Sequence, residues 1–232
     1  MEQVNVILLA AGKSERFGKE KPLLKIAGET IIERHLRQLE NINVQRCLIV
    51  VNQNNRAAVI KSVSIKVNFR IEFILQDGDG AANAICSALK ELEFCIPLYI
   101  VTVNDIVLDN TYLKMESKAN GSDFLIPTVI LQKTFIGGCL EVQLENSAIL
   151  SITERPVGGC QPGQLVNIFI HRIKGYENIK SIFHNLMNGW QYEDTLNKQL
   201  ESGFTAKFIL IEKWVGIKSH SDYEEALLMF CN

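Results

Sequence analysis

The chain alternates between short, continuously apolar runs and longer stretches in which apolar residues recur at helical spacing. Runs typical of buried strands occupy residues 4–9, 47–51, 71–75 and 98–103. Thr30 and Glu33 form a predicted capping box that opens the first helix, and further helices are predicted over 54–62, 81–92 and 111–119. This alternation predicts an α/β fold with a mostly parallel sheet covered by helices on both faces.

The second half changes its pattern. Strands are predicted over 140–144, 148–153, 166–170 and 204–211, and helices over 179–187 and 192–202. Ser221 and Glu224 are predicted to form a second capping box, which opens a last helix ending at Met229. We find no internal repeat, low-complexity tract or linker, so residues 1–232 are predicted to form a single domain whose halves meet near residue 110.

Composition excludes several classes of function. Apolar residues make up 47% of the chain and charged residues 22%, which is ordinary for a globular domain. The net charge of −2 provides no long-range field for nucleic acid or an anionic membrane. No leader pattern and no apolar window of about 18 residues is seen. The six cysteines form no CxxC pair, so we expect reduced, structural thiols and a cytoplasmic protein.

A local cluster of cations nevertheless follows the first strand. The strand ends in Ala10, Ala11 and Gly12, where backbone N–H groups can approach a ligand because no bulky side chain intervenes. The cations that follow are Lys13, Arg16, Lys19, Lys21 and Lys25. The spacing matches neither a P-loop nor a dinucleotide fingerprint. A nest for a small anion and a solvated basic loop both fit this composition.

Two more polar segments follow predicted strands. Residues 76–80 come after the third strand, and Asn104 and Asp105 come after the fourth. Because loops after parallel strands lie at one edge of a sheet, these segments and the cationic loop should converge there. The sequence therefore predicts a ligand site at that edge.

The opening motifs are similar to those of a known family. LAAGKSERFG over residues 9–18, followed by KPLLKIAGETIIER over 21–34, resembles the start of the sugar-phosphate nucleotidyltransferase superfamily. The resemblance implies a Rossmann-like three-layer sandwich with a mostly parallel mixed sheet. It also implies a nucleotide-binding half over about 1–110 and an acceptor-binding half over about 111–232. The compact spacer before Lys21 resembles the cytidylyltransferases and the molybdenum-cofactor nucleotidyltransferases.

The resemblance also implies roles for individual residues. Arg16 and Lys21 would hold the triphosphate and the transferring phosphoryl group, and Asp105 would bind Mg²⁺. The nucleotide would be lined by Leu9, Ala10, Ala11, Gly12, Lys13, Gln76 and Gly80. The acceptor would be contacted by Asn104, Gly138, Glu154, Arg155 and Asn167. Weaker likenesses at Glu154–Pro156 and at residues 214–217 extend the resemblance through most of the chain.

Three positions depart from the family pattern. The second metal carboxylate falls on Gly216, which has no side chain to ligate Mg²⁺. Asn104 and Asn167 replace glycines and add bulk where an acceptor would lie. These departures leave the acceptor, and the activity itself, open.

The implied reaction moves an NMP group from an NTP to a phosphorylated sugar or alcohol and releases pyrophosphate, with Mg²⁺ as cofactor. The compact loop favours CTP, with UTP and dTTP as alternatives, and a homodimer is compatible with the family. Two other readings stay open: a non-catalytic nucleotide-binding or regulatory homologue, and a molybdopterin-type nucleotidyltransferase.

Overall fold

The computed structural model describes residues 1–14, 17–18, 20–154 and 156–231. A ten-stranded sheet runs through the described part of the chain, with the strand order β11-β9-β10-β13-β8-β12-β6-β1-β4-β5. The first half contributes β1 (Val4–Leu9), β4 (Val44–Val51), β5 (Arg70–Leu75) and β6 (Leu98–Thr102). The second half contributes β8 (Phe124–Thr128), β9 (Cys139–Gln143), β10 (Ala148–Thr153), β11 (Leu165–Val166), β12 (Ile170–Ile173) and β13 (Ala206–Leu210).

The sheet is mixed, with one dominant strand direction. The four strands of the first half pair in parallel with one another, and β8 pairs in parallel with β13. The pairing makes β12, β10 and β11 run opposite to the other strands of this sheet. The predicted α/β, Rossmann-like sandwich with a mostly parallel mixed sheet is confirmed.

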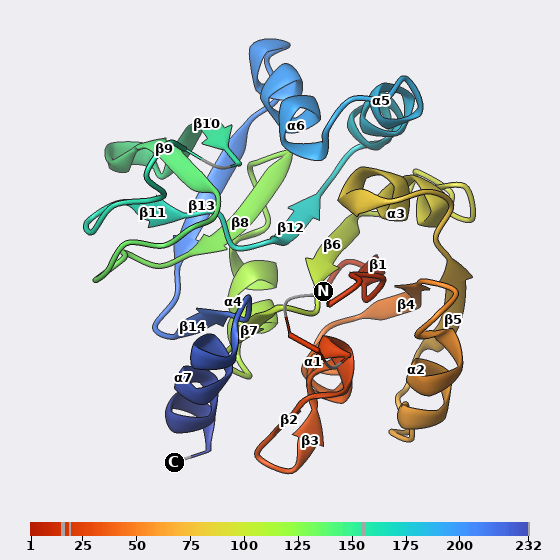
Figure 1. Ribbon diagram of the computed structural model, residues 1–232. Coiled ribbons are helices and arrows are strands. Elements are labelled where there is room, and N and C mark those ends of the chain that lie inside the picture. Colours follow the sequence, from red (N-terminus) through yellow and green to blue (C-terminus); the bar gives the residue numbers. More distant parts are fainter. Residues whose placement is uncertain (15–16, 19, 155, 232) are drawn as a thin grey trace.

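Helices cover both faces of the sheet and create two apolar cores. Along β1, Val6 and Leu8 point into one core while Ile7 and Leu9 point into the other, because successive residues of a strand face opposite sides. Figure 1 shows the two helical layers above and below the sheet. One layer holds α1 (Ile31–Leu39), α2 (Arg56–Ser62), α4 (Thr111–Lys118) and α7 (His220–Phe230); the other holds α3 (Gly80–Leu89), α5 (Tyr176–Met187) and α6 (Tyr192–Glu201).

Two small antiparallel sheets extend the layer of α1 and α7. β2 (Lys25–Ile26) pairs with β3 (Glu29–Thr30), and β7 (Asp105–Val107) pairs with β14 (Trp214–Gly216). The second pair matters for the site, because it brings the end of the chain back to the residues that follow β6. In the described part of the chain, no helix combines the length and apolar character needed to span a bilayer.

Local capping chemistry was predicted correctly at one helix and in the wrong register at another. Thr30 and Glu33 form the expected reciprocal capping box at the start of α1. At α7, the capping box consists of Ser219 and Asp222, not Ser221 and Glu224. Both pairs satisfy the spacing of the motif, so the sequence pattern did not distinguish them.

The prediction of six reduced cysteines is wrong for two of them. Cys139 at the start of β9 and Cys160 form a disulfide, whereas Cys47, Cys86, Cys95 and Cys231 are free thiols. The disulfide joins β9 to the loop that follows β10. Its partners are 21 residues apart in sequence, and nothing in their spacing indicated the pairing.

Candidate active site

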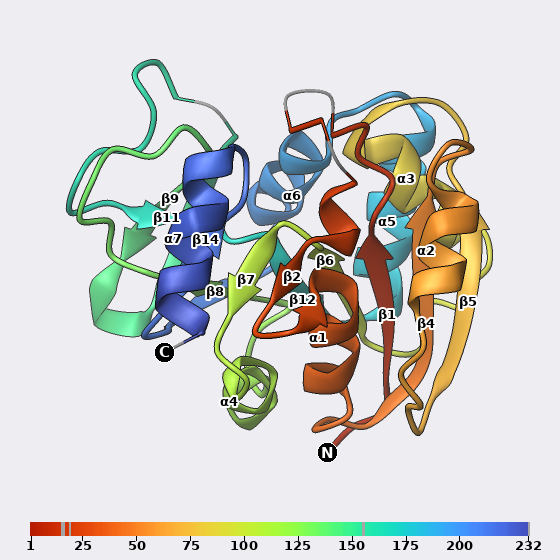
Figure 2. The same cartoon turned by 60° about the horizontal axis from the view of Figure 1, so that its bottom comes forward.

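A cavity of about 430 Å³ lies where the strands of the first half end. Figure 2 shows the loop after β1 and the start of α3 at this same edge of the sheet. The predicted convergence of the three loops at this edge is therefore found. The cavity is lined by Leu9, Ala11, Gly12, Lys13, Gln76, Asp79, Gly80, Ala81, Ala84, Thr102 and Asn104.

Two asparagine side chains from the segment after β4 hold the turn after β1. The Asn55 amide donates to the Ala10 carbonyl, and the Asn52 amide donates to the Ala11 carbonyl, each at 2.8 Å. Ala10 itself is buried and packs in the core instead of lining the cavity. A Cβ on Gly12 would meet no atom within 4 Å, so this residue borders open space. The two asparagines thus hold the turn from the side away from the cavity, and Ala11 and Gly12 line the cavity.

The loop after β5 closes the opposite wall. The Gln76 amide donates to the carbonyls of Gly78 and Gly80, at 2.8 and 3.1 Å, and thereby shapes the entry to α3. The Asp79 carboxylate forms an exposed ion pair with Lys13 at 3.0 Å, which connects this loop to the loop after β1. The N-terminus of α3 at Gly80 lies at the cavity, and helix N-termini favour anions.

Lys21 connects the first loop to the end of the chain. Its backbone N–H donates to the Ser14 hydroxyl at 3.2 Å, and its ammonium donates to the Ile217 carbonyl at 3.1 Å. The Ile217 N–H in turn donates to the Asn104 carbonyl at 2.9 Å. Lys21 is therefore placed next to both Asn104 and the β7–β14 pair. Arg16, the other predicted phosphate ligand, lies outside the described residues.

Asp105 is surrounded by hydrogen-bond donors. The Thr102 hydroxyl donates to one carboxylate oxygen at 2.6 Å, and the Trp214 indole N–H donates to the other at 2.7 Å. The Phe169 backbone N–H is a further donor. Only 8% of the residue is exposed, and burial raises the pKa of its carboxyl in spite of these donors.

Gly216 lies directly opposite Asp105 in the β7–β14 pair. A Cβ on Gly216 would come within 2.7 Å of the Trp214 ring, and the Phe135 ring packs edge-on against that indole with centroids 4.8 Å apart. Two aromatic rings thus occupy the space beside Asp105 that a second carboxylate would need.

This arrangement does not fit a metal ion held by the protein. The oxygens of Asp105 accept hydrogen bonds from three donors, one of them an indole N–H, and the facing residue has no side chain. Among the described residues, no group of three or more His, Cys, Asp or Glu side chains is arranged to hold a metal. The prediction that Asp105 is a resident Mg²⁺ ligand disagrees with these contacts, and we do not carry it into the proposed function.

Three of the predicted acceptor residues lie together beside the first residue of β9, whereas Asn104 lines the nucleotide cavity. Cys139 pairs with Thr153 of β10 on one side and with Val166 of β11 on the other. Gly138, Glu154 and Asn167 are the next residues of these three strands, so the register brings them together. The Asn167 N–H donates to the Gly138 carbonyl at 2.8 Å. Arg155 lies outside the described residues.

A buried histidine behind this group was missed from the sequence. His171 bonds the Asn167 side-chain oxygen through Nε2 at 2.9 Å and the Tyr192 hydroxyl through Nδ1 at 3.0 Å. Burial lowers the pKa of His171 to about 3, so the ring is neutral. It stacks on Phe169, whose N–H reaches Asp105. No sequence spacing indicates this network, because its members come from the segment before β12, from β12 and from α6.

Lys218, also missed, lies beside the loop that precedes β9, at residues 135–137. It follows β14 and the Lys21 partner Ile217. Its ammonium donates to the Ile136 carbonyl and lies 4.0 Å from the centre of the Phe135 ring. A Cβ on Gly137 would come within 2.0 Å of the Phe135 ring and 2.6 Å of this ammonium, so the ring and the ammonium together leave no room for a side chain there.

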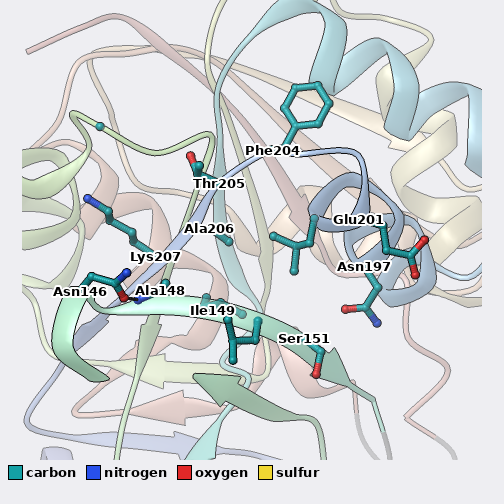
Figure 3. Close-up of a pocket in the computed structure, with 13 residues that line it drawn as sticks. Asn146, Ala148, Ile149, Ser151, Asn197, Glu201, Phe204, Thr205, Ala206 and Lys207 are labelled. Atoms are coloured by element: carbon teal, nitrogen blue, oxygen red, sulfur yellow. Dashed lines mark hydrogen bonds between the residues drawn. The ribbon is translucent and has the colours of Figure 1, made fainter. Parts of the chain in front are cut away.

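A second cavity, of about 620 Å³, lies away from these residues, between β10, β13 and α6 (Figure 3). β10 and β13 pair only at Ala148 and Lys207 before they separate. The Asn197 side chain then takes the place of a strand, because it bonds both the N–H and the carbonyl of Ile152 at 2.8 Å. None of the predicted site residues lines this cavity.

Comparison with known proteins identifies the family. The model of the MobA-like NTP transferase domain matches residues 6–129, more than half of the chain. The chain belongs to this family. The match runs from β1 to the residue after β8 and includes the whole nucleotide-side cavity. The predicted membership of the nucleotidyltransferase superfamily is therefore confirmed.

Individual relatives match either most of the chain at lower identity or a shorter part of it at higher identity. The bifunctional protein GlmU of Methanococcus maripaludis is 26% identical over 210 residues, covering 86% of this chain and 48% of the relative. The 2-C-methyl-D-erythritol 4-phosphate cytidylyltransferase of Dictyoglomus thermophilum is 32% identical over 97 residues, covering 40% of this chain and 41% of the relative. The chain thus spans about half the length, or less, of these relatives.

A solved structure confirms the fold of the whole chain. The structure of a glucose-1-phosphate thymidylyltransferase from Bacillus anthracis superimposes with a TM-score of 0.83 at 15% identity. The match covers 99% of this chain and 96% of the other. At this identity the likeness establishes the architecture of this MobA-like family member and leaves its substrates to other arguments.

Proposed function

We propose that the protein is a nucleotidyltransferase that moves an NMP group from an NTP to a small phosphorylated sugar or alcohol and releases pyrophosphate. The observation that carries this proposal is the cavity formed by the Ala11–Gly12 turn, the α3 N-terminus and Asn104, with Lys21 linked to Asn104 through Ile217. We propose further that the two halves, about 1–110 and 111–232, act as one domain. Cytoplasmic location and homodimer formation stay predictions.

The proposed step is an in-line displacement at the α-phosphorus. An acceptor phosphate oxygen forms the new O–P bond as the bond from the α-phosphorus to the bridging oxygen breaks, and pyrophosphate leaves with that electron pair. An ionised phosphate needs no general base, so the protein contributes positioning and charge stabilisation. Lys21 is proposed to face the transferring phosphoryl group, and Arg16 is proposed to assist it.

The nucleotide and its metal follow from this assignment. Leu9, Ala11, Gly12, Lys13, Gln76 and Gly80 are proposed to line the nucleotide, with Ala10 supporting the turn from the core. Mg²⁺ enters as the counter-ion of the triphosphate, and MgNTP is the substrate. The cytidylyltransferase relative supports CTP, with UTP and dTTP as the alternatives. Asn104, Gly138, Glu154, Arg155 and Asn167 are proposed to contact the acceptor.

A non-catalytic nucleotide-binding homologue is the second candidate. The observation that favours it is the Trp214 indole, which occupies the space beside Asp105 opposite Gly216. Under this alternative the chain binds an NTP and transfers nothing. A molybdopterin-type nucleotidyltransferase is a third candidate, favoured by the MobA-like domain match.

A pyrophosphate-release screen tests the proposal. It crosses ATP, CTP, GTP and UTP, with dTTP added, against sugar, polyol and amino-alcohol phosphates and molybdopterin. Turnover with one NTP and one sugar or alcohol phosphate is the expected result. A rise in melting temperature with an NTP and no turnover would establish the binding-only alternative. Turnover with an NTP in which molybdopterin is the one acceptor that reacts would establish the molybdopterin-type nucleotidyltransferase.

A further inference from the structure

A single disulfide lies next to the proposed acceptor residues in a chain whose other cysteines are thiols. Cys139 and Cys160 are bonded to each other, and the remaining four cysteines are free. Cytosolic proteins, which handle NTPs and phosphorylated metabolites, rarely carry structural disulfides, and the disulfides that they do carry are usually transient or redox-sensing. The place of this bond therefore raises the question of a redox role.

The disulfide begins at the centre of the acceptor group. Cys139 directly follows Gly138, and its strand partners in β10 and β11 are the residues that precede Glu154 and Asn167. The other sulfur belongs to Cys160, in the loop that follows β10. The bond thus ties this loop to the residue around which the three proposed acceptor residues are arranged.

Hydrogen bonds hold the same loop in place independently of the disulfide. The Cys160 N–H donates to the Phe135 carbonyl at 2.8 Å, and the Phe135 N–H donates to the Cys160 carbonyl at 2.9 Å. The Gly163 N–H donates to the Leu131 carbonyl at 2.8 Å. Opening the disulfide therefore leaves the loop over residues 156–163 attached but removes its covalent link to β9.

Each sulfur already has an oxygen nearby that suits a thiol. Cys160 Sγ lies 3.5 Å from the Gly137 carbonyl oxygen, and Cys139 Sγ lies 3.8 Å from the Gln164 side-chain oxygen. A disulfide sulfur has no proton to donate, whereas each thiol formed by reduction can donate one. The surroundings accommodate both oxidation states, and the reduced Cys160 can bond the residue that precedes Gly138.

We infer that Cys139–Cys160 is a redox-modification site, at which a dithiol reductant loosens the hold on the proposed acceptor residues. The inference rests on the proposed function, because it concerns regulation of that same acceptor group. The oxidised form is the one in which Gly138, Glu154 and Asn167 are held firmly, and the reduced form binds the acceptor more weakly.

The reduction is an exchange of one disulfide for another. A thiolate of the dithiol attacks Cys139, which is 8% exposed whereas Cys160 is fully buried. The bond between the two protein sulfurs breaks, and Cys160 leaves with the electron pair and takes a proton from water. The second thiolate of the reductant then attacks its own sulfur in the mixed disulfide, so Cys139 leaves in the same way. The protein gains two thiols, and the dithiol becomes a disulfide.

Reduction of the folded chain tests the first step without nucleotide or acceptor. The chain is treated with dithiothreitol in the absence of denaturant, quenched with acid, then unfolded and alkylated, and its thiols are counted by mass spectrometry. We expect four alkylated cysteines before reduction and six after it, with the circular dichroism of the fold unchanged. Reduction that occurs only in urea concentrations that unfold the chain would overturn the inference.

Hydrogen exchange tests the loosening of the acceptor residues. We expect the amides of residues 136–138 and 156–163 to exchange about tenfold faster in the reduced chain, and those of the nucleotide-side loop 76–80 to exchange equally in both states. Cys139→Ser/Cys160→Ser should match the reduced chain whether or not reductant is present, and Cys95→Ser should respond to reductant as wild type does. Equal exchange of residues 136–138 in the two states would overturn the inference.

Turnover then separates regulation from a general loss of structure. With any active NTP and acceptor pair, reduction should raise KM for the acceptor about tenfold and change KM for the NTP less than about twofold, because no residue from 135 to 163 lines the nucleotide cavity. An equal rise in both KM values would overturn the inference. If no pair turns over, the proposed function fails, and the thiol count and the exchange rates still decide whether this disulfide is a redox site.

Discussion

Lys21 shows how one side chain is positioned by residues distant in sequence. Its backbone bonds Ser14, seven residues earlier, and its ammonium bonds Ile217 at the end of the chain. We predict that Lys21→Gln lowers kcat by about 10²–10³-fold, because a preorganised cation at the phosphoryl group is lost. Steady-state assays of pyrophosphate release measure this change in kcat.

Lys25→Gln is the control for that variant, because Lys25 is a neighbouring exposed lysine of the same cationic stretch. Its kcat should stay within about twofold of wild type, the small effect expected of a solvated surface charge. Similar losses in the two variants would mean that the cluster acts as a diffuse field, and that Lys21 has no specific role.

His171 makes the stability of the protein depend on pH. Burial lowers the pKa of His171 to about 3, against an ordinary value near 6.5 in the unfolded chain. Between these values the unfolded state binds a proton that the folded state does not, so stability falls as pH falls from about 6.5 towards 3. The slope is about 1.4 kcal/mol per pH unit, and buried His35, with a pKa of about 4, adds a similar slope.

Urea denaturation at pH 7, 6 and 5 measures this dependence. We expect His171→Gln to be less stable than wild type at pH 7 and to lose stability less steeply on acidification. The exposed His184→Gln should keep the wild-type slope. A His171→Gln slope identical to that of wild type would contradict a buried, neutral His171.

At the scale of elements, the Cys139–Cys160 disulfide fastens β9 to the loop that follows β10. Closing a loop of this length stabilises a protein by about 3 kcal/mol, chiefly by restricting the unfolded chain. We predict that Cys139→Ser/Cys160→Ser lowers the melting temperature by about 10 °C. Wild type in reductant should match this variant, and Cys95→Ser, which removes an exposed free thiol, should match untreated wild type. No effect of reductant on wild type would contradict a stabilising disulfide.

The elements of the first half could be read from the sequence because each is a local pattern. β1, β4, β5 and β6 are continuous apolar runs, and their parallel order follows from the intervening helices. β8 was missed because Pro127 interrupts its apolar run, and proline argues against a central strand. The structure accommodates it because β12 pairs with β8 only at Phe124 and Leu125.

The same distinction between local patterns and long-range contacts applies to the candidate site. The cavity walls follow directly from strand order, so most of the residues predicted to line the nucleotide do lie there. Lys218, His171 and the Trp214 contact with Asp105 were not predicted, because they depend on β14, β12 and α6 returning to the end of β6. Such contacts between distant segments leave no periodic pattern in the sequence.

At the scale of the whole molecule, Asp105 joins the two halves. Its donors are Thr102 of β6, Trp214 of β14 and the backbone of Phe169 before β12. Asp105→Ala would leave buried donors without an acceptor, at about 1–3 kcal/mol each, so we predict a loss of about 3 kcal/mol or more in the free energy of unfolding.

Asp105→Asn should cost much less, within about 1 kcal/mol. The amide oxygen can still accept from the Trp214 indole, and the amide NH₂ can donate to the Thr102 hydroxyl, which accepts as well as donates. Urea denaturation followed by circular dichroism measures both variants. A metal ligand would give a different result, because its removal abolishes turnover in both variants and leaves stability nearly unchanged. The order of the two unfolding free energies therefore tells whether Asp105 serves the architecture or the chemistry.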